Sequence, residues 1–360
     1  MYQITNQDGK ARIGIIETPH GKINTPFYMP VATKGAVKFI ECDEAKALGT
    51  QCLISNALIN YFRPGLEILE KFGGLHNFMS WQKPLTTDSG GFQLLSDNFL
   101  VRTEKKGAVF RDPFTGKKKL ITPKKLMQIQ QAIGSDIAMV IDDVPRHDVS
   151  YDSAFRSMKN THEWARECVK VRNKGQLLFG IAQGGMFKDL RKHSAQYISS
   201  LGFDGIALGG LAIGEPIHTM KDIINFTIDF LPEEKPRYLM GVGSPLDMLE
   251  AIRCGVDMFD STFPTANARH NTAFTFKGPL KIKRFRDDSN PIEPGCDCKT
   301  CKNYSRAFVH HLMRTQEPVG KKLMTYHNLY FMHKILEEAR KAIEEKRFES
   351  FYSDFCASYK

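Results

Sequence analysis

Three cysteines late in the sequence have the spacing of a metal-binding motif. Cys296, Cys298 and Cys301 lie within six residues, and His327 follows after 25 intervening residues. Thiolates and an imidazole are ligands that Zn²⁺ prefers, and four protein ligands close a tetrahedral shell without leaving a position for water. The spacing therefore predicts one structural Zn²⁺ ion per chain, with His327 near the start of a helix.

The cysteine cluster has two alternative interpretations. A Cys-x-Cys pair would form a strained disulfide, and a reducing compartment would instead leave free thiols. Three other histidines are rivals of His327 for the fourth position, namely His310, His311 and His333. The other five of the eight cysteines are scattered singly, as is usual for small buried side chains. We expect the cluster, and not the scattered cysteines, to bind a ligand.

A second set of residues that could do chemistry consists of aspartates that follow short apolar segments. Asp260 lies in "DMFDSTFPT", Asp88 in "LTTDSGGFQ", and Asp142 with Asp143 in "MVIDDVP". Each of them could simply cap a turn or a helix. If two carboxylates face each other, one could attack an anomeric carbon while the other moves a proton to and from the leaving group. An adjacent pair that faces opposite ways would leave one aspartate for a ligand and one for the scaffold.

The elements that must position these residues are eight short apolar segments, separated by amphipathic helical patterns. Helices are expected at 123–134, after the N-cap signal of Thr122, and also at 151–169 and 188–201. Alternation of strands and helices indicates a parallel sheet with crossover helices, and eight strands predict an α/β fold of the (β/α)8 TIM-barrel type. A doubly wound sheet is the alternative. The segments are "FYMPVAT", "QCLISNA", "PLTTDSGG", "DIAMVIDD", "LLFGIAQGG", "GIALGGLA", "RYLMGVG" and "VDMFDSTF".

Polar residues, glycines or, in one case, a methionine stand at the ends of six of these segments. In a TIM barrel the carboxyl ends of all the strands meet at one mouth, where the active site lies. The barrel prediction therefore brings together Asp88, Asp142, Gln183, Gly209 with Gly210, Met240 and Asp260.

The remaining sequence predicts additions at both ends of the barrel. An alternating pattern at 11–31 indicates an N-terminal antiparallel hairpin, and residues 105–123 indicate a second hairpin around the turn "DPFTGK". Two C-terminal helices are expected at about 303–315 and 326–346. The predicted domains are a barrel with its N-terminal hairpin at 1–265, a zinc-binding helical subdomain at 266–350, and a C-terminal tail at 351–360.

Composition bounds the class of protein. Hydrophobic residues make up 42% and charged residues 25% of the chain, which is typical of a globular fold. No apolar run reaches the length of a membrane span and no signal peptide is evident, so we expect a cytoplasmic protein with no membrane partner. The net charge of +10 favours a polyanionic partner such as a nucleic acid, and residues 271–360 hold 17 Lys and Arg against 11 Asp and Glu.

Together, these motifs resemble the tRNA-guanine transglycosylases, also called queuine tRNA-ribosyltransferases, of the bacterial type. The resemblance covers nearly the whole chain and implies a TIM barrel with a zinc-bearing insertion near its C-terminus. It also implies a pentosyltransferase, homodimeric, that removes a guanine from tRNA at the anticodon wobble position and inserts a free 7-deazaguanine base, preQ1 or queuine. The motifs occur in family order: "TPHGKINTPFYMPVAT", "TTDSGGFQLLS", "GSDIAMVIDD", "FGIAQGG", "ALGGLAIGE", "YLMGVGSP", "GVDMFDSTFPT" and the cysteine-histidine signature.

The resemblance also implies roles for single residues. Asp260 would be the nucleophile that attacks C1′ of the target nucleoside, and Asp88 the general acid/base. Asp142 would accept hydrogen bonds from the base, while Gln183 and Gly210 would face its O6. The rest of the base site would comprise Ser89, Phe92, Gln93, Asp143, Gly209, Leu211 and Met240. Contacts with the RNA would come from Thr265, Asn267 and Arg269.

Two departures from the bacterial pattern bear on specificity. Ala266 stands where that pattern has an arginine that reads the flanking uridines, and Val144 stands where enzymes that use preQ1 usually have cysteine. Other functions of the same fold are exchange of preQ0 in the tRNA D-arm, as in archaeosine synthesis, a DNA-directed paralogue, and a non-catalytic RNA-binding subunit. A non-catalytic subunit would lack one of the two aspartates, yet Asp88 and Asp260 are both present.

Overall fold

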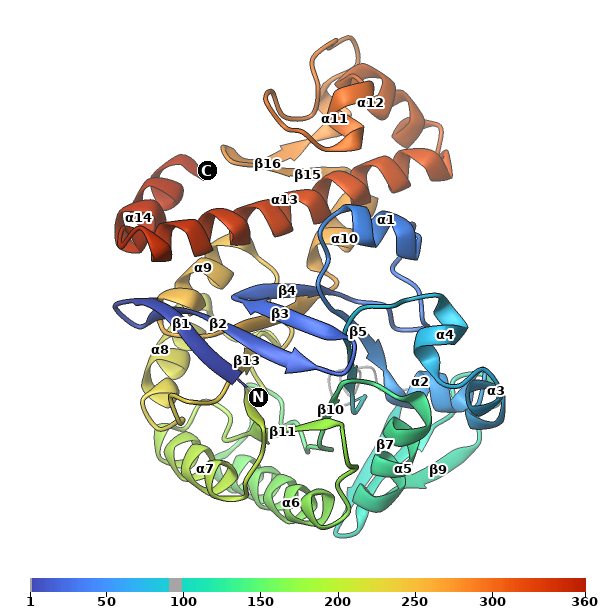
Figure 1. Cartoon of the computed structure of the whole chain (residues 1–360), viewed down its shortest axis with the longest axis vertical. Coiled ribbons are helices and arrows are strands. Elements are labelled where there is room, and N and C mark those ends of the chain that lie inside the picture. The colour runs from blue at the N-terminus through green and yellow to red at the C-terminus, as the bar shows by residue number, and fades with distance from the viewer. Residues whose placement is uncertain (1, 91–98) are drawn as a thin grey trace.

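Eight parallel strands form a closed barrel in the computed structural model, which describes residues 2–90 and 99–360 (Figure 1). Each strand pairs with the next one along the sequence, and β14 pairs with β4. The last gap, between β4 and β5, is bridged by Val31 and Ile54, with the Ala32 amide donating to the Ile54 carbonyl at 2.7 Å. The predicted (β/α)8 barrel is therefore confirmed, and the doubly wound alternative is excluded. The strands are β4 (Phe27–Pro30), β5 (Leu53–Asn56), β6 (Leu85–Asp88), β10 (Ile137–Met139), β11 (Leu177–Ala182), β12 (Gly205–Leu208), β13 (Arg237–Leu239) and β14 (Met258–Ser261).

Helices on the outside of the barrel connect these strands (Figure 1). The first of the predicted helices shows why the boundaries fall where they do. Thr122 accepts a hydrogen bond from the Lys125 amide at 3.2 Å, Pro123 occupies the first turn, and Gly134 ends the helix with a φ of 73°. The connecting helices are α1 (Cys42–Ala47), α2 (Ala57–Phe62), α3 (Leu66–Lys71), α4 (Leu75–Met79), α5 (Pro123–Ile133), α6 (Tyr151–Lys170), α7 (Lys188–Ser200), α8 (Ile217–Ile228) and α9 (Pro245–Arg253).

Two small antiparallel sheets flank the barrel. The predicted N-terminal hairpin is β2 (Ala11–Thr18) with β3 (Gly21–Thr25), and a further strand, β1 (Tyr2–Asp8), pairs with β2. β1 was not predicted, because its mainly exposed polar residues carry no clear alternation of apolar side chains. The second sheet contains β7 (Leu100–Glu104), β8 (Gly107–Arg111) and β9 (Lys118–Ile121), and the turn between β8 and β9 is held by Asp112, as the hairpin prediction requires.

The C-terminal part begins with α10 (Phe263–Arg269), directly after the last barrel strand. A long helix, α13 (Pro318–Glu344), packs along one side of the barrel, and the smaller elements lie on the far side of this helix (Figure 1). The predicted start of this helix at 326 was wrong by eight residues, since Pro318 stands in its first turn and the apolar stripe begins only later. Residues predicted as a tail lie largely in α14 (Phe348–Ser358). The smaller elements are β15 (Thr272–Thr275), β16 (Gly278–Lys281), η2 (Ile282–Arg284), α11 (Lys299–Asn303) and α12 (Arg306–Arg314).

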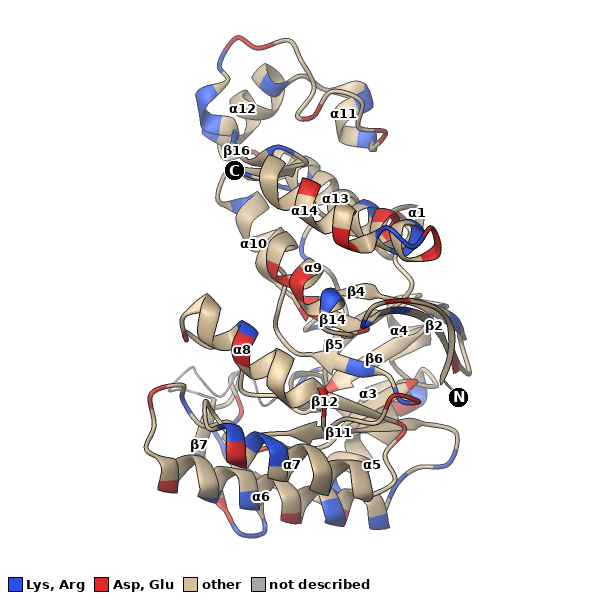
Figure 2. Cartoon of the chain, turned by 90° about the vertical axis from the view of Figure 1, so that its left-hand side faces the viewer, with Lys and Arg blue, Asp and Glu red and all other residues tan. Residues whose placement is uncertain are grey.

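Charged residues follow the outer surface of this architecture. Figure 2 shows Lys, Arg, Asp and Glu along α6 and α7 and on α12, while most of each barrel strand is free of them. The barrel strands consist mainly of buried apolar residues, and side chains such as Phe179, Ile206 and Phe259 are completely or almost completely buried. Among the helices of residues 2–90 and 99–360, none is both long enough and apolar enough to cross a bilayer.

Candidate active site and metal centre

Asp260 lies in the last barrel strand, β14, beside β13. Its Oδ1 atom accepts hydrogen bonds from the Tyr238 hydroxyl at 2.5 Å and from the Gly241 amide at 2.9 Å. Within the described part of the chain, no donor is directed at Oδ2. Burial raises the pKa of Asp260, and the two hydrogen bonds oppose this rise. One carboxylate oxygen is therefore held in place, and the other remains available for a ligand.

Asp88 ends strand β6 and belongs to the same group of carboxylates. Its Oδ1 atom accepts a hydrogen bond from the Gly90 amide at 3.0 Å, in a turn where Gly90 has a φ of 81° that favours glycine. Burial, together with the charges of Asp260 and Asp142, raises the pKa of Asp88 to about 8, although the Gly90 bond opposes the rise. Asp88 is therefore mostly protonated at neutral pH and can act as an acid.

Asp142 follows strand β10 and is 4% exposed. It accepts hydrogen bonds from Gln183 Nε2, at 2.7 Å, and from the Ser89 hydroxyl. Burial raises the pKa of Asp142 to about 6, although the Gln183 bond opposes the rise. The other amide atom, Gln183 Oε1, is buried without a partner among the described residues. A buried amide with an unsatisfied atom is a common sign of a ligand site.

Asp143 is turned away from its neighbour. Its carboxylate accepts a hydrogen bond from Asn160 Nδ2 at 2.8 Å, and its amide donates to the Thr161 hydroxyl at 2.9 Å. Both partners lie on α6. The structure thus brings Asp142 to Gln183 and Ser89, whereas Asp143 fastens the loop to the outer helix.

Gly209 and Gly210 follow strand β12 and lie against the Gln183 side chain. A Cβ atom at Gly209 would come within 2.6 Å of Gln183 Nε2, and one at Gly210 within 2.5 Å of Oε1. Only glycine leaves room for the amide at these two positions. Leu211 is buried next to them, and Met240 is half-buried just after β13. Two further residues of the predicted base site, Phe92 and Gln93, lie outside the described residues.

Arg191 connects two of these loops and was missed from the sequence. Its guanidinium is completely buried and donates to the Gly185, Gly209 and Gly210 carbonyl oxygens, at 2.7, 2.7 and 3.3 Å. Burial lowers the pKa of Arg191 to about 10. A signal was available, because this arginine interrupts the buried face of α7, between Leu190 and Ser194.

The predicted RNA contacts lie on α10, immediately after Asp260. Thr265 is buried and donates to the Thr262 carbonyl at 3.1 Å, and Asn267 donates to the Phe263 carbonyl at 3.0 Å. Both side chains therefore satisfy the helix itself. Arg269 has a buried Nη1 atom without a hydrogen-bond partner within residues 2–90 and 99–360. Of the three, Arg269 has the most unused hydrogen-bonding capacity.

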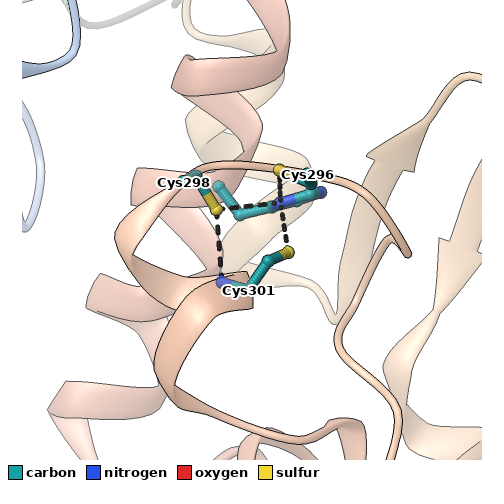
Figure 3. A group of neighbouring side chains, drawn as sticks. Cys296, Cys298 and Cys301 are labelled. Carbon is teal, nitrogen blue, oxygen red and sulfur yellow. Dashed lines mark hydrogen bonds between the residues drawn. The ribbon is translucent and has the colours of Figure 1, made fainter.

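The four predicted metal ligands form one cluster (Figure 3). His327 Nδ1 lies 3.4 Å from the Cys301 sulfur, 3.5 Å from that of Cys298 and 3.9 Å from that of Cys296. Tetrahedral Zn²⁺, with bonds of about 2.3 Å to sulfur and about 2.0 Å to nitrogen, would separate sulfur from nitrogen by about 3.6 Å. The cluster has these dimensions, so it could hold a metal ion.

The second nitrogen of the histidine supports the same ligand set. His327 Nε2 donates to the Phe274 carbonyl at 2.7 Å, which leaves Nδ1 as the lone-pair donor. His327 lies well inside α13, not near its start as was predicted. The rivals are engaged elsewhere or outside the cluster: His310 contacts the Ile282 carbonyl, and His333 the Thr50 hydroxyl. The four residues predicted as ligands, Cys296, Cys298, Cys301 and His327, therefore lie together in one cluster that could hold a metal ion.

Comparison with known proteins identifies the family. The family model described as queuine tRNA-ribosyltransferase matches residues 7–360. The chain belongs to the queuine tRNA-ribosyltransferase family. Similar proteins of that name occur in Halothermothrix orenii, 45% identical over 97% of this chain and 95% of the relative, and in Caldanaerobacter subterraneus, 45% identical over 99% and 97%. A third, in Fusobacterium nucleatum, is 44% identical over 99% of this chain and 98% of the relative.

Membership of the queuine tRNA-ribosyltransferase family confirms the resemblance and the predicted enzyme class, a transferase of glycosyl groups. The match runs through both the barrel and the C-terminal elements, so the metal cluster and the carboxylates belong to one family unit. Tyr238 and Arg191, which hold the site together, were not identified from the sequence. The period-2 pattern of β13 would have placed Tyr238 on the same face as Met240.

Proposed function

We propose that this enzyme exchanges a guanine of tRNA for a free 7-deazaguanine base by double displacement, with Asp260 as the nucleophile. The observation that carries the proposal is that two half-buried carboxylates at one barrel mouth have different surroundings. Asp88, with a pKa raised to about 8, holds a proton at neutral pH, whereas Asp260 receives two hydrogen bonds on one oxygen. An acid and a nucleophile at one barrel mouth are what a retaining glycosyl transfer needs.

In the first half of the reaction, Asp260 Oδ2 attacks C1′ of the target nucleotide. The bond between C1′ and the guanine nitrogen breaks, its electron pair leaves with the base, and Asp88 supplies the proton. In the second half, the incoming base gives a proton to the Asp88 carboxylate and attacks C1′, and the ester bond to Asp260 breaks. Two inversions at C1′ give retention of configuration.

The base would be recognised by Asp142 and its neighbours. Its carboxylate can accept hydrogen bonds from N1–H and the 2-amino group, and Gln183 can turn its amide toward O6. Support comes from the Gln183 amide, whose Oε1 atom has no partner among the described residues, so that rotation of the amide could direct Nε2 from Asp142 to O6. The two glycines packed against this amide leave room for it. Incoming bases that fit this pattern are preQ1 and queuine. The target nucleotide must leave its stack to reach the site, which is easiest in a single-stranded loop such as the anticodon loop, and this favours the wobble position.

Zn²⁺ is the metal that suits the cluster best, because three thiolates and one imidazole match its preferred ligands and the sulfur–nitrogen distances match its bond lengths. Its role would be to fasten α11 to α13, with no open position for chemistry. Metal analysis of the purified protein should find about one zinc per chain. Removal by a chelator should unfold the C-terminal elements first, and a protein of unchanged stability would contradict a structural ion.

A homodimer and a cytoplasmic location complete the proposal. Phe72 and Phe78 stack edge to face with their rings 5.3 Å apart and are 51% and 38% exposed, so they form an apolar pair at the surface that a second subunit would cover. Sedimentation analysis tests this surface as a subunit contact. It compares the unaltered protein with the variants Phe72→Ser and Phe78→Ser. The eight cysteines form no disulfide, as expected in the cytoplasm, where tRNA is available.

The deciding experiment measures incorporation of labelled guanine into tRNA transcripts. Unlabelled preQ1, queuine and preQ0 are then added as competitors, and the exchanged position is mapped by nuclease digestion. Exchange at the wobble position, blocked best by preQ1 or queuine, is the expected result. Exchange confined to the D-arm would replace this proposal with the archaeosine reaction, and a lack of incorporation into any tRNA would refute both.

A further inference from the structure

The Tyr238 hydroxyl is directed at the carboxylate that the proposed function assigns as nucleophile. Tyr238 is completely buried in β13, and its hydroxyl lies 2.5 Å from Asp260 Oδ1. The Gly241 amide reaches the same oxygen at 2.9 Å, in a turn where Gly241 has a φ of 78°. Two donors thus converge on one oxygen of the carboxylate, and the described residues direct none at the other.

A neighbouring tyrosine shows that this arrangement is not required by burial alone. Tyr28, in β4 on the other side of β14, is also buried, and its hydroxyl donates to the backbone carbonyl of Ser261. A buried tyrosine needs a hydrogen-bond partner, and a main-chain oxygen satisfies that need. Tyr238 instead uses the Asp260 carboxylate, one residue away from the partner of Tyr28.

We propose that Tyr238 is a positioning residue for the exchange reaction, which holds Oδ1 of Asp260 and thereby makes Oδ2 the atom that bonds C1′. This inference rests on the proposed function. In the ester intermediate, Oδ1 becomes the carbonyl oxygen and carries less charge, so its hydrogen bonds are weaker. When the ester breaks, the electron pair of the C1′–Oδ2 bond returns to Oδ2, and the charge is shared again with Oδ1. Tyr238 therefore favours departure of Asp260 in the second half of the reaction.

The donor stays protonated over the whole working range. Burial and the adjacent Asp260 charge raise the pKa of Tyr238 well above its usual value, so the hydroxyl always donates. The same bond opposes the rise of the Asp260 pKa caused by burial. Tyr238 consequently has two effects, orientation of the nucleophile and preservation of its anionic form.

The test compares Tyr238→Phe with the matched control Tyr28→Phe, since each removes one buried hydroxyl next to β14. For Tyr238→Phe we expect kcat to fall roughly 10- to 100-fold, the range of a hydrogen bond to a charged group, with KM for tRNA nearly unchanged. The acidic limb of the kcat–pH profile should move up by about one pH unit, and the covalent RNA adduct should accumulate. The control should keep the wild-type limb and adduct level. The inference would be overturned if the acidic limb of the kcat–pH profile moved equally in both variants, or did not move in either.

A measurement without catalysis separates the inference from the proposed function. The carboxyl carbon of Asp260 is followed by ¹³C NMR as a function of pH in the ligand-free protein and assigned with Asp260→Asn. We expect Tyr238→Phe to raise the Asp260 pKa, and an unchanged titration overturns the inference even if the enzyme is active. A raised pKa in a protein that exchanges no guanine supports the geometry and refutes the proposed function. If Tyr238→Phe does not fold, fluorotyrosine at this position, a stronger donor, should lower the Asp260 pKa instead.

Discussion

Two aspartates lie near the two ends of strand β14, and their carboxylates have different surroundings. Asp257, just before the strand, is buried, and Asp260, within it, is half-buried. At the lower end of the barrel, Asp257 accepts four hydrogen bonds: two from the Arg12 guanidinium, at 2.6 and 3.0 Å, one from Tyr2 and one from the Arg237 amide. At the mouth, Asp260 accepts two from the described residues, both on Oδ1. Both oxygens of Asp257 thus accept hydrogen bonds, whereas three residues later only one oxygen of Asp260 accepts them from the described residues.

Strand β10 repeats this contrast. Asp136, just before the strand, receives hydrogen bonds from the Leu85 amide and the rings of His20 and His76. Burial alone would raise the pKa of Asp136, but the bonds from His76 and His20 lower it. Asp142, just after the strand, has its pKa raised by burial. A carboxylate whose lone pairs are all used supports the fold, whereas one with free lone pairs is reserved for a ligand.

The largest expected effect is that of Asp260→Asn. Without an anionic oxygen no ester can form, so we expect guanine exchange to fall on the order of 10⁴-fold and the denaturation-resistant RNA adduct to disappear. The assay is gel detection of the adduct beside incorporation of labelled guanine. An undiminished yield of adduct would place the nucleophile at another residue. Asp260 would then no longer differ from Asp257 in having a catalytic role.

Asp257→Ala should lower stability and leave the chemistry intact, because Asp257 is the structural member of the pair of aspartates. The change leaves the Arg12 guanidinium, only 3% exposed, without its carboxylate, and an unpaired buried charge lowers the free energy of unfolding by about 3–5 kcal/mol. Urea denaturation at pH 7 measures the loss. Residual folded protein should still form the covalent adduct, and a catalytic defect without loss of stability would contradict the structural role.

Asp88→Asn should stabilise the fold at high pH while it abolishes catalysis. The pKa of Asp88 is raised to about 8, so folding favours its protonated form. The stabilisation that Asp88 gives to the folded state is therefore fully present below the pKa of Asp88 in the unfolded chain. It is lost as pH rises through about 8, where the carboxyl group must ionise in the folded protein. Asparagine stays neutral, so we expect a gain on the order of 2 kcal/mol at pH 9 and little change at pH 4. Thermal melts of variant and wild type at both pH values measure this gain. An equal change in stability at pH 4 and pH 9 would refute the prediction.

The smallest effect is expected for His20→Ala. The His20 ring is partly exposed and bonds Asp136 together with His76, so its loss should lower stability by about 1 kcal/mol at pH 7. Since the pKa of Asp136 is lowered, its stabilisation is present above the unfolded pKa and disappears as pH falls through the folded pKa. The difference between variant and wild type in acid titrations should therefore vanish at the lowest pH.

Much of the fold and the site could be predicted because the signals are local. Eight apolar segments separated by amphipathic helices indicate the barrel, and the barrel in turn places Asp88, Asp142 and Asp260 at one mouth. The metal cluster follows from spacing alone, apart from the position of His327 within its helix. The strand β1 and the true start of α13 were missed, since neither has a clear periodic signal at its boundary.

The sequence by itself determined the strand–helix alternation, the aspartates at strand ends and the three clustered cysteines, since each depends on neighbours close along the chain. Only the tertiary structure decided which aspartates are saturated and which oxygen of Asp260 is free. Those properties depend on donors that are distant in sequence, such as Arg12 for Asp257, Tyr238 for Asp260 and Arg191 for the Gly209 loop. Hydrogen bonds of this kind form when strands pair and loops close, so the reactivity of each carboxylate is a property of the assembled barrel.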